Sequence, residues 1–101
     1  MSLPPVLNGL KEHDPKLYSL AQELNSLAFA PGALEEKTKV LITMALDALM
    51  GADQGVKVLA ARARKAGATE EEIAEALRLA YLVAGMRTLI TATAAFPGSQ
   101  G

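Results

Sequence analysis

Two side chains of opposite charge interrupt the two most apolar stretches of this sequence. Asp47 is the only charged residue in residues 40–50, and Arg87 is the only one in residues 86–96. Burying either charge alone would cost several kcal/mol, so an ion pair within or between copies of the chain is one interpretation. A second is a polar point in an apolar cavity, where Arg87 binds a carboxylate or carbonyl compound. A third is two unrelated residues that face solvent.

Another candidate site lies at a break flanked by Gly51 and Gly55, where the next predicted helix begins. The break contains Asp53 and Gln54. Backbone N–H groups at a helix start favour an anion, which is a property of many ligand sites. However, Asp is also a residue that caps helix starts with its own carboxylate. The two interpretations are therefore Asp53 as N-cap, or Asp53 as a weak general base with Gln54 orienting a substrate.

The composition excludes some kinds of chemistry and partner. The chain has no cysteine, so neither a disulfide nor a catalytic thiolate can form. His13 is the only histidine and has no clustered ligands beside it, so we expect no metal site, and nothing indicates a cofactor. A net charge of −1 gives no electrostatic reason to expect a nucleic-acid partner. The interrupted apolar stretches fall short of the ~20 residues of a membrane span, which predicts a cytoplasmic protein without a membrane partner.

The spacing of apolar residues predicts helices and no strands. Asp14 followed by Pro15 is typical of an N-cap and a first helical residue. Apolar residues then recur at helical spacing as far as Phe29, and Pro31 ends the pattern. Before this helix, residues 1–13 contain two turn signals, Pro-Pro and Asn-Gly, and are predicted to form an irregular arm.

The second half of the chain predicts a central helix followed by further helices. A helix is predicted from about residue 33 or 34 to residue 50, and from Val40 to Met50 it is apolar on nearly every side, which is typical of a helix covered all round. Gly51 is its expected C-cap, and a one-sided helix follows at residues 53–66. Thr69 to Glu72 matches a capping box for the next helix. At Gly85 the pattern becomes uniformly apolar, which predicts a break and a last helix stopped by Pro97 and Gly98.

The length and the apolar content together indicate an assembly. A chain of 101 residues fits one domain, and alone it buries only about 60–65% of its unfolded surface. Half of its residues are hydrophobic, more than one small protomer can cover. The predicted fold is therefore all-α, with five to six helices in a single domain over residues 1–101, assembled as a homo-oligomer.

Two segments resemble a known family. They are PGALEEKTKVLITMALDALMGA at residues 31–52 and KAGATEEEIAEAL at residues 65–77. Their order and spacing resemble the carboxymuconolactone decarboxylase and alkylhydroperoxidase D-like family, over about two thirds of the chain. The resemblance implies a compact all-helical protomer that assembles as a trimer or hexamer.

In the peroxidase-like branch, the resemblance also implies a glutamate, a Cys-x-x-Cys pair and a histidine that together run thiol chemistry. Counted from Gly67, the glutamate position falls on Val40 and the histidine position on Leu59. The two cysteine positions fall on Ala52 and Gly55. None of these positions is a cysteine, and the chain contains no cysteine at all, so thiol peroxidase activity is excluded. Chemistry of the decarboxylase branch is not excluded, but no catalytic set for it maps onto these residues.

Three functions remain open from the sequence. The first is a family member without the redox site that binds or converts a small organic acid or lactone in an apolar pocket, with Asp47, Arg87 and Asp53 as candidate site residues. The second is a non-catalytic oligomeric scaffold, or a partner subunit of an active relative. The third is a peroxidase in name only. A polar pocket containing Asp47 or Arg87 favours the first, and a pocket filled by side chains favours the second.

Overall fold

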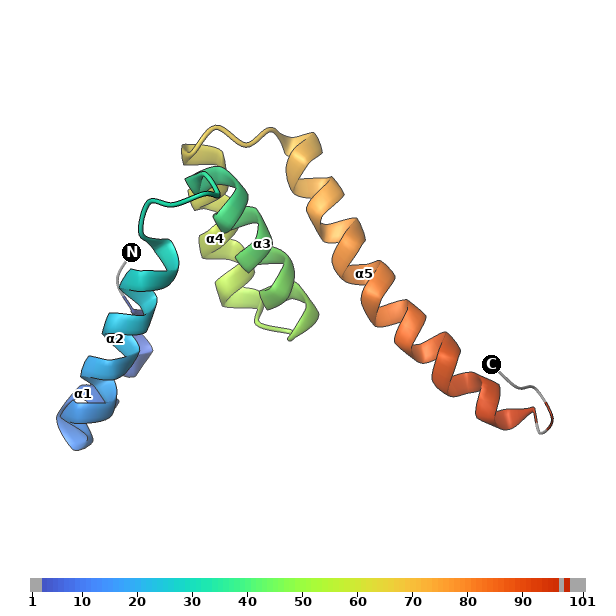
Figure 1. Cartoon of the computed structure of the whole chain (residues 1–101), viewed down its shortest axis with the longest axis horizontal. Helices are drawn as coiled ribbons and strands as arrows, with labels where there is room; N and C mark the ends of the chain where they lie inside the picture. Colours follow the sequence, from blue (N-terminus) through green and yellow to red (C-terminus); the bar gives the residue numbers. More distant parts are fainter. Residues whose placement is uncertain (1–2, 97, 99–101) are drawn as a thin grey trace. The chain divides into compact units, whose positions relative to one another are not determined.

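The computed structural model describes residues 3–96 and 98, and within them every regular element is helical (Figure 1). Short 3-10 helices, η1 and η2, lie near the two ends of this part of the chain. The elements, in order, are η1 (Pro5–Leu7), α1 (Asn8–His13), α2 (Pro15–Phe29), α3 (Glu36–Leu49), α4 (Asp53–Lys65), α5 (Glu70–Ala92) and η2 (Thr93–Ala95). The predicted all-α class with five to six helices is confirmed by these five α-helices.

The chain divides into two compact units, Met1–Glu36 and Lys37–Gly101. A single domain over residues 1–101 therefore stays a prediction.

The first unit is a pair of helices, α1 and α2. Asp14 is the N-cap of α2, as predicted: its Oδ1 accepts a hydrogen bond of 3.1 Å from the Leu17 N–H, and Pro15 is the first helical residue. The prediction of an irregular arm over residues 1–13 is wrong for Pro5–His13, which is helical; residues 1 and 2 lie outside the described residues. The turn signals act as helix-start residues here, and the packing of α1 on α2 outweighs their weak helix propensity.

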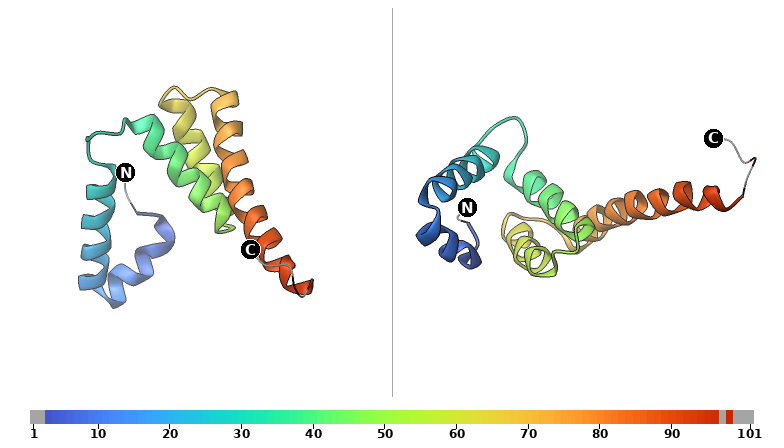
Figure 2. Two further views of the ribbon diagram at one scale, coloured as in Figure 1. Left: turned by 45° about the vertical axis from the view of Figure 1, so that its right-hand side comes forward. Right: turned by 90° about the horizontal axis from the view of Figure 1, so that it is seen from below.

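In the second unit, α3 and α4 run antiparallel and α5 follows α4 (Figure 2). The link from α3 to α4 is a Schellman motif around Gly51, which has a φ of +75°. In it, the Ala52 N–H donates to the Asp47 carbonyl at 2.9 Å and the Gly51 N–H donates to the Ala48 carbonyl at 3.2 Å. Only a residue that tolerates positive φ fits this turn, so Gly51 fixes where α3 ends.

The link from α4 to α5 uses the same motif. Gly67 has a φ of +98°, and the Ala68 N–H donates to the Ala63 carbonyl at 2.9 Å. Thr69 and Glu72 then form the predicted capping box at the start of α5. The two glycine turns and the capping box together set the directions of the three helices.

The buried core of the second unit is small and lies where α3, α4 and the start of α5 meet. It consists of Val40 and Met44 from α3, Leu59 and Ala63 from α4, and Ala68 and Ile73 near the α5 start. In α3 and in α4 the two buried residues are four positions apart, as an apolar helix face requires. The observed start of α3 is Glu36, two or three residues later than the predicted start.

The predicted break at Gly85 is wrong, because α5 is one continuous helix from Glu70 to Ala92. Its C-terminal half extends past the α3–α4 pair (Figure 2). Gly85 keeps helical geometry because good helix formers surround it. Of the predicted stop, Pro97 lies outside the described residues. No helix in the described part of the chain is long and apolar enough to cross a membrane.

Candidate functional site

Asp47 lies in the last turn of α3, and its carboxylate packs directly against the backbone of Gly55 in the first turn of α4. Asp47 is half-buried. A Cβ atom placed on Gly55 would collide with the Asp47 Oδ2 and would lie 2.9 Å from the Asp47 carboxyl carbon. Gly55 therefore provides the space that the Asp47 carboxylate occupies.

This position explains the lone charge of α3. The Asp47 carboxylate therefore lies against the first turn of α4, and a negative charge near a helix N-terminus is favourable. Asp47 forms no ion pair with Arg87 within the described residues, and Arg87 itself is exposed.

Asp53 has a different local role from the one predicted. The N-cap of α4 is Ala52, whose side chain accepts no hydrogen bond, and Asp53 is the first helical residue. The Asp53 Oδ1 accepts a hydrogen bond of 3.0 Å from the Gln54 N–H. The N-cap of α4 is therefore Ala52, one residue before Asp53, and the N-cap interpretation of Asp53 is wrong. An exposed carboxylate in the first turn still complements the helix dipole.

The four positions that the resemblance predicts for a thiol site have structural surroundings that suit their apolar or small side chains. Val40 is fully buried and Leu59 is almost fully buried in the core. Ala52 is the N-cap of α4, and Gly55 lies under Asp47. At the α3–α4 turn, the half-buried Asp47 carboxylate lies beside Gly55, the last of these positions.

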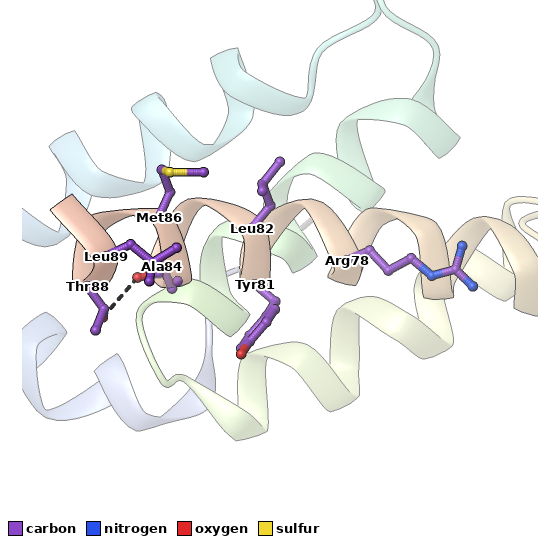
Figure 3. A pocket seen from close by; sticks show the side chains of 8 residues that line it. Arg78, Tyr81, Leu82, Ala84, Met86, Thr88 and Leu89 are labelled. Carbon is purple, nitrogen blue, oxygen red and sulfur yellow. Dashed lines mark hydrogen bonds between the residues drawn. The ribbon is translucent and has the colours of Figure 1, made fainter. Parts of the chain in front are cut away.

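Two open hollows lie along α5, in the half of the helix that extends past α3 and α4. The first has a volume of about 540 Å³ (Figure 3). It is lined by Arg78, Tyr81, Leu82, Ala84, Gly85, Met86, Thr88 and Leu89. The ring of Tyr81 lies beside Gly85, where a Cβ atom would be 3.9 Å from two ring carbons. The Thr88 hydroxyl donates to the Ala84 carbonyl at 3.3 Å, so it is not aimed at the hollow as a free donor.

The second hollow has a volume of about 500 Å³ and contains Arg87. Arg87 is the only charged side chain of its lining, which is completed by Leu82, Val83, Met86, Ile90 and Thr91. A guanidinium in apolar surroundings binds a planar carboxylate through two hydrogen bonds. The sequence predicts Arg87 as a site residue but does not predict the hollow around Tyr81. The only feature of the sequence that could indicate this hollow is a tyrosine four residues before a glycine in an apolar helix.

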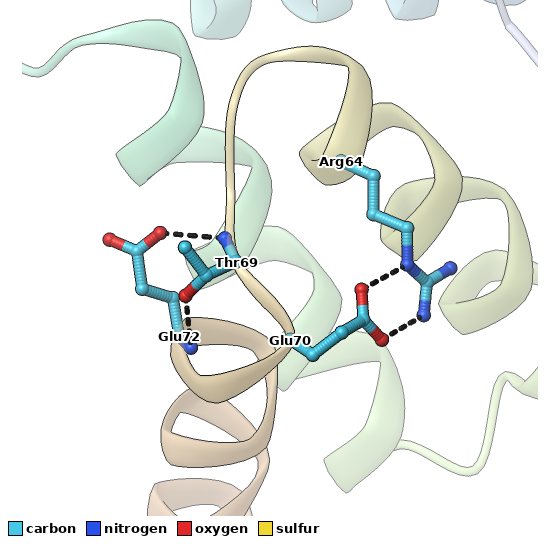
Figure 4. A network of polar contacts seen from close by, with 4 residues as sticks. All are labelled: Arg64, Thr69, Glu70 and Glu72. Atoms are coloured by element: carbon cyan, nitrogen blue, oxygen red, sulfur yellow. Dashed lines mark hydrogen bonds and ion pairs between the residues drawn. The ribbon is translucent and has the colours of Figure 1, made fainter.

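A polar network fixes the start of α5 (Figure 4). Arg64 donates to the two carboxylate oxygens of Glu70 at 2.7 and 3.0 Å. In the capping box, the Thr69 N–H donates to Glu72 at 2.8 Å and the Glu72 N–H donates to the Thr69 hydroxyl at 3.0 Å. The Lys37 Nζ also donates to Glu72 at 3.0 Å, which joins α3 to α5.

The network shifts the proton affinities of its members. The hydrogen bond from Arg64 lowers the pKa of the Glu70 carboxyl, and Glu70 in turn raises the pKa of Arg64. The pKa of the Glu72 carboxyl is lowered first by the hydrogen bond from the Thr69 backbone and then by the one from Lys37. These groups are exposed or partly exposed, so their role is to orient α5 and not to react.

The described residues hold no group of three or more His, Cys, Asp and Glu side chains that could bind a metal ion. His13 is exposed at the end of α1. Asp47 and Asp53 lie on either side of the α3–α4 turn, and Arg87 lies on the extended half of α5. The structure therefore gives two separate candidate places: a carboxylate site at the turn and a cationic site on α5.

Comparison with known proteins gives consistent results. The model of the carboxymuconolactone decarboxylase family matches residues 15–96. Two uncharacterized proteins of Methanocaldococcus jannaschii are similar: MJ1511 is 31% identical over 86 residues, covering 85% of this chain and 80% of the relative. MJ0742 is 33% identical over 78 residues, covering 76% of this chain and 75% of the relative. A crystal structure of a protein from Methanobacterium thermoautotrophicum has a TM-score of 0.79 at 30% identity, covering 86% of this chain and 98% of the other.

Proposed function

Because the chain belongs to the carboxymuconolactone decarboxylase family and contains no cysteine, we propose that it is a non-redox member that binds or converts a small organic acid or lactone. The observation that carries the proposal is the position of Arg87 as the only charged side chain of an apolar hollow. The carboxylate of the ligand binds the guanidinium, and its hydrocarbon body packs on Leu82, Met86 and Ile90.

The size of the hollow supports a ligand of this class. A volume of about 500 Å³ is within the range of ~300–1,000 Å³ that is typical of small-molecule sites. The hollow lies on one helix, so it needs a second wall to enclose a ligand. The homo-oligomer predicted from the sequence, a trimer or hexamer, would supply that wall from another copy of the chain.

For a reaction, we assign proton transfer to Asp47 and not to Asp53. Asp47 is the less exposed of the two carboxylates at the α3–α4 turn, and a general base works best where water is partly excluded. Both carboxylates repel an anionic ligand at short range, so the ligand's carboxylate binds at Arg87. In this proposal, Asp47 acts on the bound compound only where the assembly brings the turn of one copy near Arg87 of another.

The proposal is tested by ligand binding to matched variants. A panel of apolar monocarboxylic acids, dicarboxylic acids and lactones is screened against the full chain by calorimetry. We expect Arg87→Met to weaken binding of the carboxylic acids at least about tenfold, the scale of one lost charge-assisted hydrogen-bond pair. Lys57→Met removes the same charge from an exposed site on α4 and serves as the control. Equal affinities of Arg87→Met and the unchanged chain would refute the site.

A second candidate function is a non-catalytic scaffold or partner subunit. It is favoured by the complete burial of Val40 and the near-complete burial of Leu59, because the positions of proton-transfer groups have become hydrophobic core. This candidate predicts no binding across the ligand panel. It also predicts mixed oligomers when the chain is refolded with a cysteine-containing family member, detected by native mass spectrometry. Residence in the cytoplasm and the lack of nucleic-acid and membrane partners stay predictions from composition.

A further inference from the structure

The leucines of α2 face away from the helix on which α2 packs. Leu17, Leu20, Leu24 and Leu27, called here the α2 seam, are between 48% and 73% exposed. The less exposed side of α2 carries Tyr18, whose ring lies 5.8 Å from the Lys11 Nζ of α1. No residue of α2 is buried, and its four seam leucines are among its exposed residues.

A second exposed apolar row runs along α5. Leu79, Leu82, Met86 and Leu89, called here the α5 seam, are between 46% and 64% exposed. The less exposed side of α5 carries Ile73, Leu77 and Ala80. From the helical repeat, the α5 seam lies on roughly the opposite side of the helix.

The two seams have the same spacing. In each, the apolar residues stand at positions i, i+3, i+7 and i+10, which is the a and d pattern of helices that pack knobs into holes. Each seam covers ten residue steps, or about 15 Å of helix. Four layers of one seam can therefore face four layers of the other without an unmatched residue.

We propose that the α2 seam of one copy of this chain packs on the α5 seam of a second copy. In one contact each copy contributes four large side chains, each about half exposed or more, which is less apolar surface than the ~800 Å² that each partner gives to a standard interface. Every protomer takes part in two such contacts, one through each seam, and its eight seam side chains together offer several hundred Å². One kind of contact between α2 and α5, repeated around the assembly, covers both seams of every protomer. Pairing α5 with α5 would leave the α2 seam exposed.

The inference goes beyond the proposed ligand site and stands without it. Leu82 and Met86 belong both to the α5 seam and to the lining of the Arg87 hollow. The second copy would thus also provide the missing wall of that hollow. Loss of ligand binding in Arg87→Met would leave the contact between copies unchanged, so the two proposals fail separately.

The cysteine-free chain allows a direct test by disulfide trapping. Leu24→Cys is mixed, after refolding, with Leu82→Cys for an antiparallel register or with Met86→Cys for a parallel one, and the mixture is oxidised. One variant carries a heavy isotope, so mass spectrometry distinguishes mixed from like pairs. We expect the yield of mixed disulfide dimers in one register to be at least about tenfold higher than in the control mixture of Leu24→Cys with Lys57→Cys. Two cysteines that the interface holds close together have an effective concentration near mM.

Three outcomes would overturn the proposal. They are like pairs of Leu82→Cys alone, a disulfide within one chain of the Leu24→Cys/Leu82→Cys double variant, and no pair above background in either register. Circular dichroism checks that each variant is folded. A charge pair guards against loss of folding: Leu24→Lys is combined with Leu82→Glu for the antiparallel register or with Met86→Glu for the parallel one. Each variant alone should lower the sedimentation mass, and mixing the pair of the trapped register should restore it. Failure of the mixture to re-associate while both remain helical would also contradict the contact.

Discussion

Asp47 shows that a lone charge in an apolar helix can lie against the backbone of a neighbouring helix. The charge pattern predicts a counter-ion as one interpretation, with Arg87 as the candidate. Within the described residues, the Asp47 carboxylate lies against Gly55 in the first turn of α4. A pattern of charges cannot reveal this neighbour, because it is an uncharged glycine that the α3–α4 turn brings against Asp47.

The close contact between Asp47 and Gly55 predicts an unusual mutant. Replacing Gly by Ala inside a helix normally stabilises it by about 1 kcal/mol. Gly55→Ala should instead destabilise the protein by about 1–3 kcal/mol, because the new Cβ displaces the Asp47 carboxylate. Urea unfolding measures the change. In an Asp47→Ala background most of the loss should disappear, and a loss that persists there would show another cause.

The absence of cysteine makes a prediction about activity. The purified protein should show no reduction of an organic hydroperoxide above the rate without protein, with dithiothreitol as reductant, because no thiolate can attack the peroxide. Oxidised dithiothreitol is measured by its absorbance. A cysteine-containing family member is the positive control. Turnover by this chain that survives repurification would disprove the non-redox assignment.

Glu72 predicts a dependence of stability on pH. Its pKa is lowered in the folded state by Thr69 and Lys37. The Glu72 carboxyl therefore binds a proton less readily in the folded state than in the unfolded state. The contribution of ionised Glu72 to the free energy of unfolding is complete above the ordinary carboxyl pKa, and it is lost as the pH falls through the lower pKa of the folded state. Glu72→Gln keeps the capping-box geometry but should flatten the fall in thermal stability below about pH 4.5. Glu71→Gln, which removes a charge from the same turn without removing a hydrogen bond, should leave it unchanged.

At the scale of elements, the caps were the most predictable feature. Asp14 with Pro15, and Thr69 with Glu72, mark helix starts by specific local hydrogen bonds that need no distant partner. The sequence predictions are wrong in Pro5–His13 and at Gly85, where glycine or proline signals predict a break and the chain is helical. In both places the flanking residues favour helix, and one glycine costs only about 1 kcal/mol.

The candidate site was predictable only in part. Arg87 stood out as a lone charge, and it does line an apolar hollow. The hollow around Tyr81 was not predictable, since it depends on how side chains of one helix spread beside Gly85. The role of Gly55 was also hidden, because its reason is a contact with a residue on another helix.

Gly85→Ala tests the interpretation of α5 as one helix. A Cβ atom there meets only the Tyr81 ring, at 3.9 Å, so the substitution should stabilise the protein by about 0.5–1 kcal/mol. Urea unfolding of Gly85→Ala is measured together with that of Gly55→Ala. The free energy of unfolding should rise for Gly85→Ala and fall for Gly55→Ala. A destabilised Gly85→Ala would mean that another helix approaches α5 closely at this glycine.

At the scale of the whole molecule, the chain has little to hold it together alone. The core of the second unit has six fully or nearly fully buried apolar residues among those described, and three of them are alanine or valine. Many larger apolar side chains are exposed, including both seams. A domain of this size has a marginal stability even with a full core. Folding and association are therefore expected to be coupled.

The coupling predicts that the melting temperature depends on protein concentration. A tenfold increase in concentration shifts an association equilibrium by ~1.4 kcal/mol, which corresponds to several degrees for a chain of this length. Circular dichroism melts between micromolar and millimolar concentrations measure the slope. Leu20→Lys places a charge in the α2 seam, so it should lower the melting temperature and reduce the slope. Ser19→Lys, on an exposed neighbouring position, is the control. A melting temperature that stays constant over this range would show that the protomer is stable by itself and that the exposed seams need no partner for folding.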